Sequence, residues 1–170
     1  WRFADRLDAS IDLVILWMTA KEDNVEWLKA KSLGLTIVSF PDYIASVSEN
    51  KTRVVVAWSH GKTTTTSMIM HVLQEQWITF DYVVWSKLDG FDLSVQLTED
   101  APIIIIEWDE YPASKIDWEP KLRKYNHTIW ILNGIEWDHM NVFPTFEKYV
   151  AAFDHFVNDT KPDWMLFWNR

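Results

Sequence analysis

The sequence of 170 residues predicts an α/β protein with a mainly parallel sheet. Short runs of β-branched and aliphatic residues, such as 53–57 and 102–106, alternate along the chain with segments of helical periodicity. This alternation is typical of βαβ units, whose strands are parallel. Hydrophobic residues make up 48% of the chain and charged residues 24%, which is the balance of a globular protein and excludes a disordered one.

The first 50 residues predict two strands and two helices. Residues 11–16 form a mostly apolar run, the pattern of a strand covered on both faces. Asn24 is placed to cap a helix, and Gly34 is placed to end it. The apolar residues that we expect this helix to bury are Val25, Leu28 and Leu33. The remaining elements are a strand at 35–40 and a short helix at 41–46.

Beyond residue 50 the alternation of strands and helices restarts. The polar segment 48–52 is expected to be a solvated joint, and it marks the predicted domain boundary. A helix at 62–76 carries Ile69, Val72 and Leu73 on the side that we expect to face the sheet. The strands of this part are predicted at 53–57, 81–84, 102–106, 128–132 and 165–167.

A last helix is predicted to begin after Thr145, which is placed to cap it. Its apolar residues recur at helical spacing, and we assign this stripe to the hydrophobic core. The members of the stripe are Phe146, Tyr149, Val150, Phe153 and Val157.

Charge and composition exclude several classes of function. The net charge is −9, so the chain lacks the broad positive field with which proteins hold nucleic acid or an anionic membrane. The chain has no cysteine, which excludes thiolate metal sites and a cysteine nucleophile and fits a reducing compartment. Residues 13–18 are the longest apolar run near the start, far short of the roughly 20 residues of a membrane-spanning helix. No targeting peptide is visible, and we expect a cytoplasmic chain excised from a longer one.

Residues 58–66 predict a phosphate-binding loop. They read Trp-Ser-His-Gly-Lys-Thr-Thr-Thr-Thr and lie between an apolar strand and an amphipathic helix. A strand, a Gly-Lys-Thr turn and a helix N-terminus bind phosphate because successive amides and the helix dipole point at the anion. Lys62 would contact the terminal phosphates and the Thr63 hydroxyl would hold Mg²⁺. The motif therefore predicts a P-loop-type nucleotide site.

Two further polar segments directly follow predicted strands. Residues 107–110, Glu-Trp-Asp-Glu, can face a phosphate-bound metal or can be a solvated acidic turn. In the second segment, 133–139, His139 can ligate a metal, orient a phosphate or be structural. Ligands collect beyond the carboxyl ends of strands in open α/β sheets. The three segments together therefore favour one nucleotide site.

These segments resemble the central ATPase domain of the Mur ligases. Residues 1–50 resemble the end of the N-terminal, Rossmann-like UDP-sugar-binding domain of that family, and 51–170 the first part of its ATPase domain. The rest of the ATPase sheet and the C-terminal domain have no counterpart here, so the chain resembles a piece of a ligase. The residues that carry the resemblance are Ser59, His60, Gly61, Lys62, Thr63, Thr64, Thr65, Glu107, Asp109, Glu110, Asn133, Asp138 and His139.

The resemblance implies an ATP-dependent ligase that joins an amine to UDP-N-acetylmuramate in the cytoplasm, for peptidoglycan synthesis or recycling. ATP phosphorylates the muramoyl carboxylate to an acyl phosphate, which the amine then attacks. Mg²⁺ and Lys62 neutralise charge on the moving phosphoryl group. Carried over by position, Thr63 and Glu107 hold one Mg²⁺, His139 serves a second, and Asn133 borders the nucleotide, which the loop residues 59–65 bind.

The resemblance also points to a substrate. Residues 107–111 and 117–125 are most similar to the family members that add the peptide L-alanyl-γ-D-glutamyl-meso-diaminopimelate. Addition of L-alanine is the alternative within the family, and a non-catalytic nucleotide-binding module is the alternative outside the enzymes. A GTPase is less expected because the sequence has no Asn-Lys-x-Asp segment.

Glycine is scarce in this chain and tryptophan is abundant. There are 4 Gly and 12 Trp, whereas average usage would give about 12 Gly in this length. The family loop begins with glycine where Trp58 stands, and a side chain there would fill the space in which the backbone curls around phosphate, so we expect weak ATP binding. Both numbers have a single explanation if glycine codons were read as tryptophan. The alternatives are that the sequence was designed or that it diverged from the family in evolution. Glycine would also suit positions 17, 85 and 108.

Overall fold

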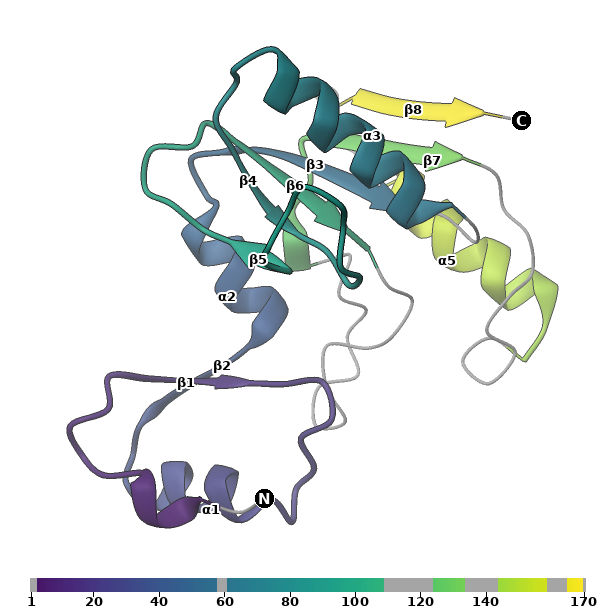
Figure 1. Ribbon diagram of the computed structural model, residues 1–170. Coiled ribbons are helices and arrows are strands. Elements are labelled where there is room, and N and C mark those ends of the chain that lie inside the picture. Colours follow the sequence, from purple (N-terminus) through teal and green to yellow (C-terminus); the bar gives the residue numbers. More distant parts are fainter. Residues whose placement is uncertain (1–2, 58–60, 109–123, 134–143, 159–164, 170) are drawn as a thin grey trace. The chain divides into compact units, whose positions relative to one another are not determined.

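The computed structural model of this chain describes residues 3–57, 61–108, 124–133, 144–158 and 165–169. These residues divide into two compact units (Figure 1). The first is formed from Trp1–Ser46 and Tyr111–Tyr125, and the second from Val47–Glu110 and Asn126–Arg170. Among the residues described, no helix has both the length and the apolar character needed to cross a bilayer.

The first unit contains a pair of parallel strands. Leu13 pairs with Thr36 and Leu16 with Ser39. The side chain of Asn24 accepts hydrogen bonds from two amides in the first turn of the following helix, which confirms the predicted N-cap. The elements are η1 (Ala4–Arg6), β1 (Leu13–Leu16), α1 (Val25–Ser32), β2 (Thr36–Ser39) and α2 (Phe40–Val47).

Helix α1 confirms the predicted burial only in part, because Val25 and Leu33 are half-buried but the third predicted residue is exposed. Leu28 is 48% exposed, whereas Ala30 is fully buried. Two positions along a helix differ by about 200° around its axis, so a helix that buries Ala30 turns Leu28 to water. The prediction for Leu28 is therefore wrong, although the helix itself begins and ends as expected.

The second unit is built on a six-stranded sheet in the order β5-β4-β6-β3-β7-β8. All pairs are parallel except the one between β4 and β5. This arrangement confirms the predicted mainly parallel α/β fold. The strands are β3 (Thr52–Ala57), β4 (Phe80–Val83), β5 (Val95–Gln96), β6 (Ile103–Glu107), β7 (Ile129–Asn133) and β8 (Met165–Asn169).

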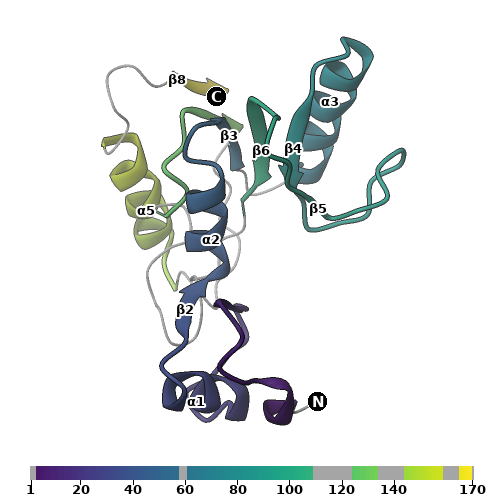
Figure 2. The same cartoon turned by 90° about the vertical axis from the view of Figure 1, so that its left-hand side faces the viewer.

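Helices α3 (Lys62–Glu75) and α5 (Phe146–Asn158) lie on opposite sides of this sheet (Figure 2). Helix α3 contacts β3 and β6. It buries Thr66 and Met70 completely, while Val72, which was predicted to face the sheet, is 62% exposed. Residues 66 and 70 are one turn apart and define the inner face, and Val72 points away from it. The other two predicted inward residues, Ile69 and Leu73, do pack against the core.

Two further predictions about burial need correction. The apolar stripe on α5 is exposed at its ends, where Phe146 is 44% and Val157 42% exposed. Val150 is half-buried. The side chains of the other two stripe residues lie outside the described set. Ser48 is fully buried although it was expected in a solvated joint. The reason is that α2 continues to Val47, so Ser48 directly follows a helix instead of starting a linker.

Candidate nucleotide-binding site

The predicted phosphate loop lies at the carboxyl end of β3, in the middle of the sheet. Gly61 is the N-cap of α3, and its φ of 77° is in the left-handed region that glycine adopts without strain. A Cβ built at Gly61 would meet nothing within 4 Å, so glycine is required here for its backbone conformation and not for space. Trp58, Ser59 and His60 lie outside the described residues.

The N-terminus of α3 is suited to an anion. The helix has 14 residues, and its N-cap glycine supplies no side-chain cap. Its first turn contains Lys62 and no acidic residue, so no carboxylate within that turn neutralises the positive end of the helix dipole. Lys62 and Thr65 are half-buried and Thr64 is exposed.

Glu107 brings the neighbouring strand into the site. It is the last residue of β6 and pairs with Val56 of β3, and it is only 3% exposed. Its Oε1 accepts a hydrogen bond of 2.5 Å from the hydroxyl of Thr63, at the start of α3. The structure therefore places together two predicted site residues that are 44 positions apart in the sequence.

Trp85 holds the other side of the Glu107 carboxylate. Its backbone amide donates to Glu107 Oε2 at 3.1 Å, and its indole Nε1 donates to the Glu107 carbonyl oxygen at 2.8 Å. Sequence reasoning did not assign this contact. A usable signal existed, because Trp85 closely follows β4, which is parallel to β6 and reaches the same edge of the sheet.

The remaining predicted residues are placed only in part. Asn133 is the last residue of β7, which pairs with β3 on the side opposite β6, so its backbone reaches the same edge of the sheet. Its side chain and the whole of 134–143, including His139, lie outside what the structure describes, as do Asp109 and Glu110. Within the described residues, no group of three or more His, Cys, Asp or Glu side chains could hold a metal ion.

The described tryptophans at expected glycine positions do not show a glycine conformation. Among the described residues other than glycine, φ is positive only at Trp77 and Asn126. Trp108 is 3% exposed, and its amide donates to the carbonyl of Val56. Trp17 is 48% exposed and lies edge-on to Phe40, with 5.0 Å between the ring centroids.

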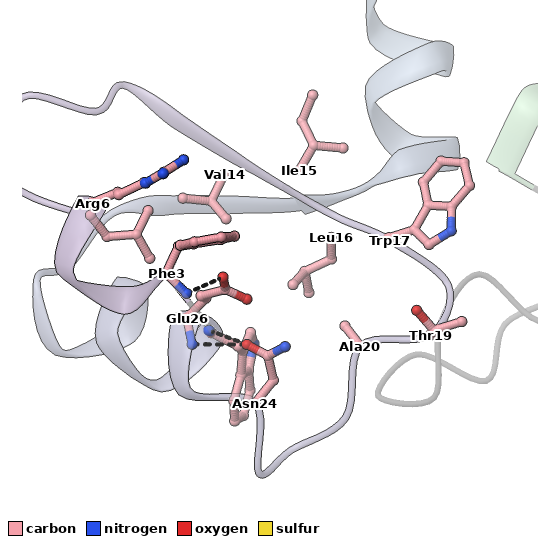
Figure 3. Close-up of a pocket in the computed structure, with 12 residues that line it drawn as sticks. Phe3, Arg6, Val14, Ile15, Leu16, Trp17, Thr19, Ala20, Asn24 and Glu26 are labelled. Atoms are coloured by element: carbon pink, nitrogen blue, oxygen red, sulfur yellow. Dashed lines mark hydrogen bonds between the residues drawn. The ribbon is translucent and has the colours of Figure 1, made fainter. Parts of the chain in front are cut away.

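The first unit contains a pocket of about 470 Å³ (Figure 3). It lies along β1, whose residues line it together with Trp17 and Ala20, and it extends to η1 and the start of α1. Phe3 donates its amide proton to Glu26 Oε1 at 2.9 Å, and the Arg6 guanidinium lies 4.1 Å from the centre of the Phe3 ring. Among the described residues that line the pocket, the charged side chains are those of Arg6 and Glu26, and most of the others are apolar.

Residues 56–170 match the family model of the Mur ligase middle domain, which is more than half of the chain. The chain belongs to the Mur ligase family. The P-loop-type fold predicted for the second unit is the fold of this Mur ligase domain, so family and fold are both confirmed.

Two types of Mur ligase are found among the relatives. UDP-N-acetylmuramate–L-alanine ligase of Carboxydothermus hydrogenoformans is 31% identical over 160 residues, which cover 94% of this chain and 32% of that protein. UDP-N-acetylmuramate–L-alanyl-γ-D-glutamyl-meso-2,6-diaminoheptandioate ligase of Haemophilus influenzae is 30% identical over 155 residues, which cover 89% of this chain and 34% of that protein. The chain spans about a third of the length of these relatives.

A solved Mur ligase is similar in structure to this chain. The crystal structure of UDP-N-acetylmuramate:L-alanyl-γ-D-glutamyl-meso-diaminopimelate ligase from Neisseria meningitides matches with a TM-score of 0.85 and 26% sequence identity. The match covers 98% of this chain and 54% of that chain. The likeness therefore extends over both units of the chain.

Proposed function

We propose that this chain supplies the nucleotide-binding part of an ATP-dependent ligase that joins an amine to the carboxylate of UDP-N-acetylmuramate. One observation carries the proposal. The hydroxyl of Thr63, one residue after Lys62 in a Gly-Lys-Thr turn, is hydrogen-bonded to the buried carboxylate of Glu107. A cation, a hydroxyl and a carboxylate at one helix N-terminus are the groups that phosphoryl transfer from a nucleotide requires.

The described residues fit a magnesium ion. Mg²⁺ prefers oxygen ligands, and it is commonly held by one or two carboxylates together with substrate phosphates and water. Thr63 and Glu107 provide a hydroxyl and a carboxylate that are already in contact, in a part of the protein where the strand ends are buried. We assign the first Mg²⁺ to these two residues, and we retain His139 as the candidate for a second.

ATP, when bound with Mg²⁺, would supply the phosphoryl group that turns an unreactive carboxylate into an acyl donor. Lys62 places a positive charge at the start of α3, and the first amides of that helix point toward the same space. Trp85 fixes the rotamer of Glu107 through its backbone amide, so the carboxylate keeps its position without a bound ligand.

For the amine substrate we propose the peptide L-alanyl-γ-D-glutamyl-meso-diaminopimelate, with L-alanine as the second candidate. Support for the peptide is the similarity at 107–111 and 117–125; support for L-alanine is the relative from Carboxydothermus. Assaying the full-length parent protein with each amine separates the two.

We assign part of the UDP-sugar site to the pocket of the first unit, where Arg6→Ala is expected to weaken binding of uridine diphosphate.

Titration calorimetry with Mg-ATP tests the proposed site. We expect weak binding by the unmodified chain and at least about tenfold tighter binding by Trp58→Gly, because glycine frees the backbone of the loop. Adding Lys62→Ala to that variant should abolish the gain. Lys87→Ala is the matched control, since it removes the same charge from an exposed site outside the loop. Tight binding by the unmodified chain, or a gain that survives Lys62→Ala, contradicts the proposal.

A further inference from the structure

Trp77 occupies a backbone conformation that suits glycine. Its φ is 57°, in the left-handed region where the Cβ of an L-residue crowds the following carbonyl. Its side chain is 94% exposed, so packing does not offset this strain. A bulky aromatic residue in this conformation is an outlier among folded proteins.

The hydrogen bonds around Trp77 explain why the conformation is imposed. Helix α3 ends at Glu75, and the amide of Trp77 donates to the carbonyl of Gln74 at 3.0 Å. The next amide, of Ile78, donates to the carbonyl of Leu73 at 3.0 Å. These two bonds form a Schellman motif, in which the residue at the position of Trp77 is left-handed and is usually glycine.

The same chain ends α1 with the same motif, and there the residue is glycine. Gly34 has a φ of 66° and donates to the carbonyl of Lys31 at 3.1 Å, while Leu35 donates to the carbonyl of Ala30 at 3.1 Å. The two helix ends are therefore equivalent in hydrogen bonding and in backbone angle. They differ in the residue that occupies the left-handed position.

The other left-handed positions follow the same rule. In the part of the chain that the structure describes, Gly34, Gly61 and Gly90 have positive φ, and so does Asn126. Asparagine tolerates this region because its short polar side chain bonds locally. Trp77 is the exception in this set, and the chain as a whole carries 12 Trp and 4 Gly.

We propose that the natural protein carries glycine at position 77, and that tryptophan stands there because a glycine codon was read as tryptophan. The inference rests on backbone geometry and does not depend on the proposed function. It concerns a position that family resemblance did not single out. A chain in which these codons are read as glycine would also have glycine at position 58, at the start of the phosphate loop.

Peptide mass spectrometry of the protein isolated from its natural source tests the proposal directly. We expect the peptide that spans Gln74–Ile78 to have the mass of a glycine at position 77. A tryptophan mass at this position overturns the proposal, whatever the ATP titration gives. The peptide that contains Trp130 serves as the control. Trp130 is fully buried in the sheet, and we expect this peptide to have the mass of a tryptophan at position 130.

Thermal unfolding of recombinant variants tests the physical basis. Trp77→Gly should raise the midpoint by roughly 2–4 °C, and Trp77→Ala should raise it by less than half as much, because alanine keeps the Cβ. Gly34→Ala is the matched control, since a Cβ at Gly34 meets nothing within 4 Å, and it should lower the midpoint by a similar amount. If alanine at position 77 stabilises as much as glycine, the indole and not the backbone is responsible, and the assignment is overturned.

Discussion

At the scale of single residues, the candidate site depends on the Glu107 carboxylate. Its side chain is almost fully buried and is held from two sides, by the Thr63 hydroxyl and by the backbone amide of Trp85. Both donors fix the positions of the two carboxylate oxygens. The carboxylate is therefore oriented before any ligand arrives.

Glu107→Gln should separate binding from stability. Glutamine has the same shape and can still accept from Trp85, so we expect the free energy of unfolding to change by about 1 kcal/mol or less. In the Trp58→Gly background, affinity for Mg-ATP should fall by at least about tenfold. Loss of a group that only supports a metal ligand already lowers metal affinity by about this factor, and Glu107 is proposed to be a ligand itself. Calorimetry and urea unfolding measure the two effects. Glu75→Gln, at the exposed end of α3, should change neither, and unchanged Mg-ATP affinity in Glu107→Gln would contradict the metal assignment.

His127 should make the protein less stable in acid. Burial, together with the smaller effect of the nearby positive charge of Arg53, lowers the pKa of His127 to about 4. A histidine pKa that is lower in the folded state favours folding above about pH 6.5, and this contribution is lost as the pH falls toward 4. We expect a loss on the order of 2 kcal/mol across this window, measured by urea unfolding at several pH values. In His127→Gln the free energy of unfolding should change less steeply with pH. An equally steep change would mean that groups other than His127 cause the loss.

At the scale of secondary structure elements, a buried ion pair fixes the amino ends of two strands. Lys51 directly precedes β3, and its Nζ lies 2.6 Å from Oδ2 of Asp81 in β4. Asp81 Oδ1 also accepts from the amide and the hydroxyl of Thr98, at 3.0 and 2.9 Å. The side chains of the pair are 7% and 0% exposed. Two strands that are not neighbours in the sheet are joined by this network.

Removing the cation of this pair should destabilise the second unit strongly. Lys51→Met leaves the Asp81 carboxylate buried without its partner, which is expected to lower the free energy of unfolding by roughly 3 kcal/mol. The double variant with Asp81→Asn should recover part of the loss, because no unpaired charge then remains. Lys87→Met, on the surface, should stay within about 0.5 kcal/mol. Urea unfolding measures all three, and a double variant no more stable than Lys51→Met would contradict the argument.

Sequence patterns predicted the elements better than their faces. The strand at 53–57 and the helix at 62–76 appear within one residue of the predicted ends, because their apolar periodicity and their capping residues are local properties. Leu28 and Val72 were assigned to the wrong side, because the face of a helix is chosen by what packs on it. The two residues of β5 are too short for any periodicity.

The site could be predicted to a similar extent. Gly61, Lys62 and Thr63 form a recognisable motif, and the acidic residue that bonds to Thr63 follows a strand that pairs with β3. The backbone contribution of Trp85 could not be predicted from its residue type, since any residue there carries the same amide. The left-handed Trp77 was equally invisible, because the sequence alone predicts nothing of φ at a tryptophan.

At the scale of the whole molecule, the chain has two units, and the predicted nucleotide site falls entirely within the second. The net charge of −9 makes binding of an anion dependent on the local arrangement at the start of α3, because the overall field repels it. Affinity for nucleotide should therefore be decided by a few residues of the loop and not by the surface as a whole.

Hydrogen exchange should report this localisation. In Trp58→Gly, saturating Mg-ATP should slow exchange of the amides at Gly61–Thr65 and leave those of α1 in the first unit unchanged. Exchange measured by mass spectrometry with and without Mg-ATP tests this, and free uridine serves as a ligand without phosphate. Equal protection in both units would mean that the nucleotide is not bound at the loop alone.

The position of the Lys51–Asp81 pair has a consequence for how such a protein can change. The pair lies at the amino edge of the sheet, whereas Thr63 and Glu107 meet at the carboxyl edge. A buried ion pair that stabilises the sheet and the groups of the proposed nucleotide site thus lie at opposite edges of the sheet. We therefore expect that substitutions at the amino edge can change thermal stability, in evolution or in engineering, with little effect on the proposed site.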